Sequence, residues 1–175
     1  MEFKEFNWEN GGEINISKLI TQKLSADDYK KINSCTVISC HDVIIDYNGK
    51  CLLITRNNFP AKGELWVLGG RIEKGLSIEE SLKKRVKEES NLDIYDINFL
   101  GCCRTFFKTD PFNHGNGVDS INLIFYAKAR GELKLDNFHK DPILLSKNDY
   151  NSNFKEKLNP FVKYILDLGM PLIGR

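Results

Sequence analysis

A glycine-rich bend that runs into a capped helix constrains this chain more than any other feature. The stretch extends from Gly69 to Ser77 and reads GGRIEKGLS, with three glycines in seven residues. Such a main chain can bend sharply and approach another group closely. Ser77 followed by Glu80 is the capping-box pattern, which predicts a helix beginning at about Ile78. Asn91 can adopt the left-handed conformation that ends it.

Two glutamates near the end of this predicted helix break the local rules of helix stability. At about 100° per residue, the apolar stripe of the helix consists of Ile78, Leu82 and Val86. Glu89 projects onto the same side, where a carboxylate is costly unless a positive or donating group meets it. Glu88 and Glu89 also oppose the helix dipole. Residues that break local rules in this way are candidates for function.

The glutamate pair has two interpretations. A divalent cation bound by carboxylate oxygens and a glycine carbonyl would compensate both charges. The alternative is a structural pair at a fraying helix end, with Lys84 and Arg85 as ion-pair partners one turn earlier. Helix geometry alone does not decide between them, because structural ion pairs are common.

The segment from Gly70 to Leu92 resembles the box of the Nudix hydrolases. In that pattern a glycine is followed six residues later by a glutamate. Then come arginine-glutamate, an apolar residue, a spacer, two glutamates, a spacer, glycine and an apolar residue. The matching positions are Gly70, Val86, Glu88, Glu89 and Leu92. The departures are Leu76 for the early glutamate, Lys84 for the arginine, Arg85 for the first helix glutamate and Asn91 for the later glycine.

The wider sequence is similar to one branch of that family, the GDP-mannose mannosyl hydrolases, which has a reduced box. The segment from Thr55 to Trp66 resembles the run of arginine, Pro-Ala, glycine and tryptophan in that branch, and Gly69-Gly70-Arg71 resembles its Gly-Gly-Arg. His139 resembles the histidine that these enzymes carry before a late strand. The similarity covers roughly residues 24–168.

This resemblance implies a metal site with few protein ligands. Glu89 would be the main carboxylate, the Gly69 carbonyl a backbone ligand and Glu88 a further ligand. Because Arg85 replaces the first helix glutamate, we expect one Mg²⁺ ion, with Mn²⁺ as a substitute, where typical relatives use two or three. Phe138 stands where the mannosyl hydrolases have a glutamine that helps to hold the metal, which removes another ligand.

Two arginines are candidates for binding a diphosphate. Arg56 and Arg71 lie just before and just inside the glycine bend, and a guanidinium offers a fork of donors that suits phosphate oxygens. The alternative is that each forms an ordinary surface ion pair. We interpret both as catalytic and substrate-binding residues that stabilise the charge of the diphosphate.

His139 is the candidate general base, because the usual pKa range of histidine suits proton abstraction from water near neutral pH. A lone histidine is more often structural, and only the resemblance favours this one. His41 and His114 are reserve candidates. Asp42 is a weaker candidate for substrate binding, because it lies about one position from an aspartate that the relatives use on sugar or base.

The resemblance implies a nucleoside-diphosphate sugar of GDP-mannose or GDP-glucose type as substrate. Ordinary Nudix hydrolases split the phosphoanhydride, with metals neutralising charge. The mannosyl hydrolases instead let water attack the anomeric carbon and release GDP and sugar. The reduced box favours the second reaction. The alternatives are a conventional pyrophosphohydrolase and a nucleotide-sugar binding protein without catalysis.

The 175 residues fit one α/β (α+β) domain, a Nudix-type α/β/α sandwich with a mixed sheet. We expect an N-terminal extension at residues 1–24, whose aromatic residues pack on the domain or across a homodimer, and a Nudix domain at residues 25–170. Expected strands are 35–46, 51–56, 65–68, 97–107, 119–130 and 139–145, and a closing helix is expected at 154–168. A net charge of +1 gives no broad electrostatic attraction to nucleic acid or membrane. Without a secretory pattern or a metal-type cysteine pair, we expect a cytoplasmic protein.

Overall fold

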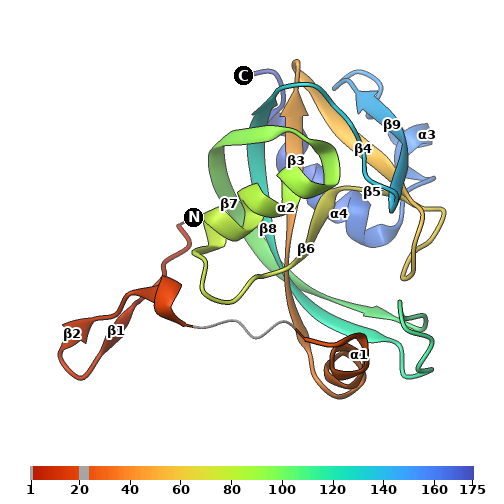
Figure 1. The fold of residues 1–175 in the computed structure, drawn as a ribbon. Helices are drawn as coiled ribbons and strands as arrows, with labels where there is room; N and C mark the ends of the chain where they lie inside the picture. The colour runs from red at the N-terminus through yellow and green to blue at the C-terminus, as the bar shows by residue number, and fades with distance from the viewer. Residues whose placement is uncertain (1, 20–23) are drawn as a thin grey trace.

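The computed structural model describes residues 2–19 and 24–175, and its helices pack on both faces of a mixed sheet (Figure 1). Met1 and residues 20–23, which belong to the expected N-terminal extension, lie outside the described residues. The strands are β1 (Trp8–Glu9), β2 (Gly12–Glu13), β3 (Ile38–Tyr47), β4 (Lys50–Arg56), β5 (Leu65–Trp66), β6 (Leu68–Arg71), β7 (Asp93–Phe107), β8 (Val118–Arg130) and β9 (His139–Leu145). The helices are η1 (Ile16–Lys18), α1 (Ala26–Cys35), α2 (Ile78–Ser90), α3 (Ser152–Lys155), α4 (Pro160–Gly169) and η2 (Met170–Leu172).

The main sheet has the order β5-β4-β3-β8-β7, with β6 also paired to β3 and β9 to β4. Strands β3 and β8 run parallel, and the other pairs are antiparallel. The α+β class and the mixed sheet predicted from the sequence are therefore confirmed. The main differences in strand boundaries are three. β3 begins at Ile38 because α1 continues to Cys35, β7 begins at Asp93 rather than Ile97, and the strand expected at 65–68 is divided into β5 and β6.

The register of the sheet brings candidate residues together in pairs. Asp42 of β3 lies opposite Gly69 of β6, and Arg56 of β4 lies opposite His139 of β9. Neither pair is close in the sequence, so each is a product of strand pairing. The sheet thus gathers into one region residues that the sequence places on four separate strands.

Strand β3 separates the two helical layers, because its side chains alternate between its faces. His41 faces α2, where its Nε2 lies 2.9 Å from the Oγ of Ser81. Ile44 faces the other side, where α4 crosses it at Gly169. The core on both sides is apolar and nearly inaccessible, as Val43, Ile44 and Ile45 illustrate with at most 1% exposure.

Helix α2 begins and ends where the sequence predicts. The Ser77 side chain accepts a hydrogen bond from the Glu80 N–H, and the Glu80 carboxylate accepts one from the Ser77 N–H. Asn91 closes the helix with φ of 60°. The N-terminal segment adds a cap that the sequence did not suggest, because the Glu5 carboxylate accepts from the Ile78 N–H at 3.0 Å.

The closing helix predicted at residues 154–168 is wrong as a single element. Proline lacks an N–H and disfavours helical conformation in the residue before it. Asn159 is accordingly extended, with ψ of 139°, and its side chain caps α4, which has Pro160 in its first turn. Helix α3 ends before this point as a separate short turn.

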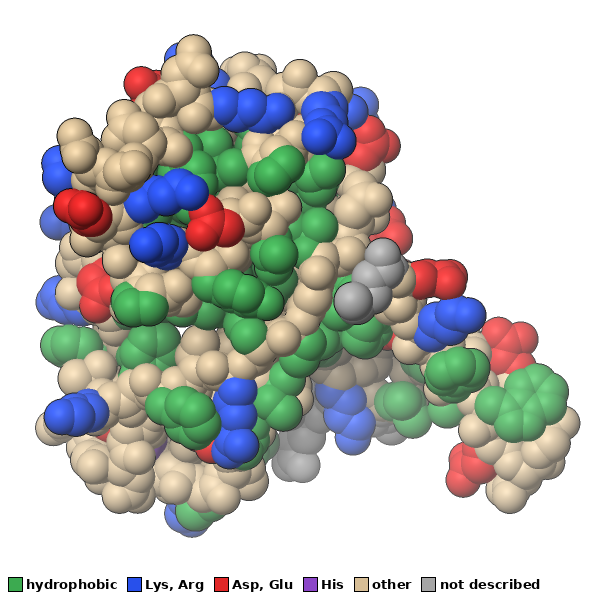
Figure 2. Space-filling view, turned by 180° about the vertical axis from the view of Figure 1, so that it is seen from behind, with side chains coloured by type: hydrophobic (Ala, Val, Ile, Leu, Met, Phe, Trp, Pro, Cys, Tyr) green, Lys and Arg blue, Asp and Glu red, His purple; other side chains and the backbone are tan. Residues whose placement is uncertain are grey.

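The aromatic residues of the N-terminal segment divide into two groups. Phe3 packs on the domain, with its ring 5.5 Å from that of Phe99. Phe6 and Trp8 do not pack on it, because they are 85% and 67% exposed. Figures 1 and 2 show the β1–β2 hairpin standing away from the sheet. The division of the chain at residue 24 stays a prediction.

Among the described residues, no helix combines the length and the apolar character needed to cross a bilayer. The five cysteines are all in the thiol form, and Cys51 is fully buried.

Gly169→Ala tests the contact between α4 and β3. A Cβ at this position would lie 2.6 Å from Cδ1 and 2.9 Å from Cγ2 of Ile44. We expect a loss of about 1–3 kcal/mol in the free energy of unfolding, although glycine to alanine in a helix ordinarily stabilises. Urea denaturation measures it. Gly101→Ala is the control, because a Cβ there meets nothing within 4 Å, and an equal loss in both variants would contradict the assignment.

Candidate active site

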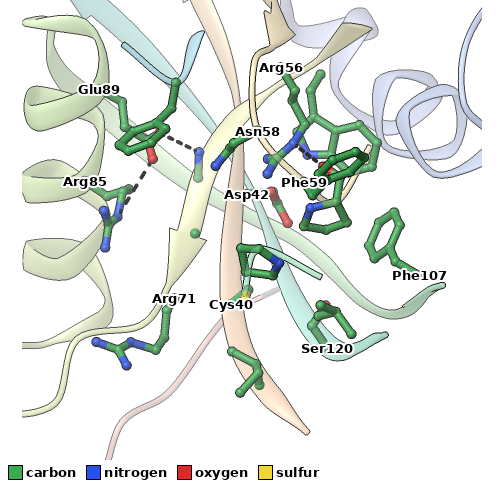
Figure 3. Close-up of a pocket in the computed structure, with 18 of the residues that line it drawn as sticks. Cys40, Asp42, Arg56, Asn58, Phe59, Arg71, Arg85, Glu89, Phe107 and Ser120 are labelled. Atoms are coloured by element: carbon green, nitrogen blue, oxygen red, sulfur yellow. Dashed lines mark hydrogen bonds and ion pairs between the residues drawn. The ribbon is translucent and has the colours of Figure 1, made fainter. Parts of the chain in front are cut away.

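A cavity of about 580 Å³ collects every site residue proposed from the sequence except the two reserve histidines. Those lining residues are Asp42, Arg56, Gly69, Arg71, Glu88, Glu89 and His139. They come from β3, β4, β6, α2 and β9, and Figure 3 shows α2 on one side of β6 and Asp42 and Arg56 on the other. The fold therefore assembles in one place residues that are far apart in the sequence.

The glycine bend lets helix α2 reach this cavity. A Cβ on Gly69, whose φ is 156°, would collide with the main-chain carbonyl of His41. The Gly69 N–H donates a hydrogen bond of 3.2 Å to Oε2 of Glu89. Because β6 has no side chains at residues 69 and 70, groups on α2 can meet groups on β3 and β4 across it. The carbonyl of Gly69 as a metal ligand stays a prediction.

Glu89 is buried, as its projection onto the apolar stripe predicts. Burial raises the pKa of its carboxyl to about 8, and the positive charge of Arg85 and the Gly69 N–H oppose this rise. Glu88, one residue earlier, has a side chain that is 52% exposed. The two glutamates therefore differ strongly in environment, and Glu89 is the one held inside the cavity wall.

Arg85 lies between the two glutamates. Its Nη1 is 3.7 Å from Oε2 of Glu88, and its Nε is 4.0 Å from Oε1 of Glu89. Part of the alternative interpretation of the glutamate pair, an ion pair with Arg85, is thus present. Lys84 turns elsewhere, to Glu73 at 2.7 Å.

These donors do not make a ready metal centre. In residues 2–19 and 24–175, no group of three or more His, Cys, Asp or Glu side chains is arranged to hold a metal ion. Both glutamates proposed as ligands already face a guanidinium. The metal site at Gly69, Glu88 and Glu89 stays a prediction that this arrangement does not favour.

Arg56 and Arg71 are held in place by contacts that leave donors for a ligand. Arg56 Nε donates to the carbonyl of Pro60 at 2.8 Å, and its guanidinium lies 5.7 Å from the centre of the Trp66 ring. The guanidinium of Arg71 lies 4.4 Å from the centre of the Tyr29 ring. Cation–π contacts hold a guanidinium without using its hydrogen-bond donors.

His139 is paired with Asp136, a residue that the sequence analysis did not single out. Nδ1 of His139 lies 2.7 Å from Oδ1 of Asp136, which fixes Nδ1 as the protonated nitrogen and leaves Nε2 to accept a proton. Burial lowers the pKa of His139, and Asp136 partly opposes this. The histidine is thus neutral near pH 7. The only hint in the sequence is the three-residue spacing.

The reserve histidines do not line the cavity. His41 is fully buried against Ser81, and His114 is bonded to Asn33 with 2.8 Å between Nε2 and Oδ1. Asp42 does line the cavity, and burial raises the pKa of its carboxyl to about 7 against the effect of Arg56.

A polar shelf and several aromatic rings complete the wall. Thr105 and Ser120 are joined at 2.9 Å through their hydroxyls, and Asn122 donates to Thr105 at 3.0 Å. The aromatic lining residues are Tyr29, Phe59, Trp66, Phe107, Phe112 and Phe138. Hydroxyl and amide groups beside aromatic faces suit a ligand with both hydroxyl-rich and flat parts. This shelf was not predictable from the sequence, because Thr105 lies on β7 and the other two residues lie on β8.

Comparison with known proteins places the chain in a family. A family model described as NUDIX domain matches residues 41–164. The chain belongs to the NUDIX domain family. As a Nudix hydrolase it falls in a group that acts on nucleoside-diphosphate compounds and generally uses divalent metal ions such as Mg²⁺.

Two curated relatives are similar to this Nudix hydrolase. The low-salt glycan biosynthesis protein Agl8 of Haloferax volcanii is 27% identical over 84% of this chain and 91% of its own length. An ADP-ribose pyrophosphatase of Methanocaldococcus jannaschii is 43% identical over 53% of this chain and 52% of its own length.

Among solved structures, a MutT Nudix hydrolase from Burkholderia pseudomallei matches 76% of this chain and 98% of its own, with a TM-score of 0.61 and 17% identity. A MutT protein from Methanosarcina mazei Go1 matches 75% of this chain and 91% of its own, with a TM-score of 0.58 and 19% identity. At this identity they support the fold alone.

Asp42→Asn tests the environment of the buried carboxyl. Its pKa is raised in the folded state, so the folded protein holds a proton that the unfolded chain has lost. Wild-type stability from this group is therefore present at pH 4 and lost as pH rises through 7. Relative to wild type, the variant should gain roughly 2–4 kcal/mol between pH 4 and pH 8 in urea unfolding. Asp141→Asn, at an exposed carboxylate, should show no such trend, and a flat difference for Asp42→Asn would contradict burial as the cause.

Proposed function

We propose that this Nudix hydrolase cleaves a nucleoside-diphosphate sugar of GDP-mannose or GDP-glucose type by water attack at the anomeric carbon. The observation that carries this proposal is the His139–Asp136 pair, which borders the same cavity as Arg56 and Arg71. A neutral histidine oriented by a carboxylate can activate water. Two guanidinium groups in the lining of the same cavity can receive a diphosphate.

In this reaction, Nε2 of His139 takes a proton from water as the oxygen bonds to the anomeric carbon. The bond from that carbon to the diphosphate oxygen breaks, and its electron pair leaves with the nucleoside diphosphate. Arg56 and Arg71 stabilise the charge that develops on the leaving group. The shelf of Thr105, Ser120 and Asn122 provides partners for sugar hydroxyls. In this mechanism the role of a bound Mg²⁺ or Mn²⁺, where present, would be to neutralise the diphosphate.

The two curated relatives differ in how far they support a nucleoside-diphosphate sugar as the substrate. The name of the Haloferax volcanii relative connects that protein with glycan biosynthesis, and that similarity extends over most of both chains. The name of the second relative points to the other reaction, cleavage of a diphosphate in ADP-ribose. A conventional pyrophosphohydrolase is therefore the second candidate. The homodimer, the cytoplasmic location and a purely binding role stay predictions.

A product assay separates the two reactions. Incubation with GDP-mannose in ¹⁸O-labelled water should give GDP and mannose, with the label in mannose, because the proposed attack is on carbon. Mass spectrometry of both products measures this. GMP and mannose 1-phosphate would contradict the proposal and favour the pyrophosphohydrolase, for which ADP-ribose is the parallel substrate.

Variants of the histidine pair test the base. His139→Gln should lower kcat by about 10²–10⁴-fold, because proton abstraction from water is lost. Asp136→Asn should lower kcat less and move the acid limb of the pH–rate profile to lower pH, because the carboxylate raises the pKa of His139. His114→Gln, outside the cavity lining, is the control. An unshifted acid limb in Asp136→Asn would rule out His139 as the titrating base.

A further inference from the structure

Arg85 extends from α2 to the glycine bend, where the resemblance predicts a metal ion. A Cβ on Gly70 would lie 3.3 Å from Nε of Arg85, so the side chain packs directly against the bare main chain of β6. It lines the cavity together with Arg56 and Arg71, and Figure 3 shows it beside Glu89. A positive group therefore already occupies this part of the wall.

The contacts of Arg85 leave one of its hydrogen-bond donors unused. Its distances to Glu88 and Glu89, 3.7 Å and 4.0 Å, are those of ion pairs and are too long for hydrogen bonds. Its Nε is buried and has no hydrogen-bond partner in the described part of the chain. A buried donor without an acceptor is unfavourable, and a ligand that brings an acceptor relieves it.

A diphosphate is the acceptor that suits this donor. Guanidinium groups bind phosphate oxygens through directed N–H groups and keep their charge. Arg85 approaches from the α2 side of β6, whereas Arg56 lies on the far side (Figure 3). A divalent cation entering between Glu88 and Glu89 would meet the guanidinium at close range, and like charges repel strongly in a partly buried site.

We propose that the guanidinium of Arg85 takes the place of the divalent cation in this site, so that the chain binds the diphosphate of its substrate without a metal ion. The ligand class rests on the proposed function. The charge substitution itself rests on the position of Arg85 between the two glutamates. Residue 85, where the Nudix pattern has a metal-binding glutamate, thus carries the opposite charge.

Calorimetric titration with GDP tests the diphosphate half of this proposal. For wild-type protein, the dissociation constant of GDP in excess EDTA should agree within about threefold with its value in excess Mg²⁺. Arg85→Glu should bind at least about 100-fold more weakly in EDTA and recover with Mg²⁺. Lys83→Glu makes the same charge change on the same helix, at a residue paired with Glu79 outside the cavity lining, and should match wild type. Circular dichroism verifies that each variant is folded.

Titration with Mn²⁺, followed by electron paramagnetic resonance, tests the cation half without any nucleotide. The dissociation constant of wild type for Mn²⁺ should be above about 1 mM. Arg85→Glu should gain a Mn²⁺ site with a lower dissociation constant. Tight binding of one Mn²⁺ by wild type, or loss of GDP binding in EDTA, would overturn the proposal. If GDP fails to bind in any condition, the proposed substrate class is wrong, and the Mn²⁺ result still decides which cation this site prefers.

Discussion

The hydrogen bond from the Gly69 N–H to the Glu89 carboxylate joins the two layers that the site needs. It fixes the end of α2 against β6 at a point where β6 has no side chains. Without those glycines, a Cβ at residue 69 would collide with β3, and α2 could not present Arg85 and Glu89 to a cavity on the sheet. The geometry of the candidate site thus depends on a main chain that has no side chains where the helix crosses it.

Strand pairing supplies the other half of the site. The antiparallel register of β4 and β9 sets Arg56 opposite His139, and the register of β3 and β6 sets Asp42 opposite Gly69. A slip of one residue in either pair would turn these side chains to the opposite face. The positions of the site residues therefore depend on the apolar core, which fixes the strand register. Val43, Ile45 and Leu52 are fully buried members of this core.

Features of this fold that depend on residues close together in the sequence were predictable, and features that depend on packing between distant segments were not. Helix α2 was predictable because Ser77, Glu80 and Asn91 specify its ends within a few residues. The pairing of Asp136 with His139 was not, because it depends on how the lead-in to β9 folds back on the cavity. The sequence indicated Arg85 as an ion-pair partner of Glu88 and Glu89, and both pairs are present. Its contact with the bare main chain at Gly70 was not predictable, because the direction of a long side chain depends on its packing. The helix expected at 154–168 is divided because Pro160 can begin a helix but disfavours helical conformation in the residue before it.

The two departures that most separate this site from a multi-metal Nudix centre are chemically linked. A metal ion in such centres both neutralises the phosphates and prepares the nucleophile. Attack on a sugar carbon needs only the first of these from a cation, because the His139–Asp136 pair can prepare the water. Charge neutralisation requires no coordination geometry, so a guanidinium at residue 85 can supply it from the helix itself. In the proposed reaction, the loss of a carboxylate at residue 85 and the use of a histidine base are therefore parts of one solution, in which the protein supplies its own cation and its own base.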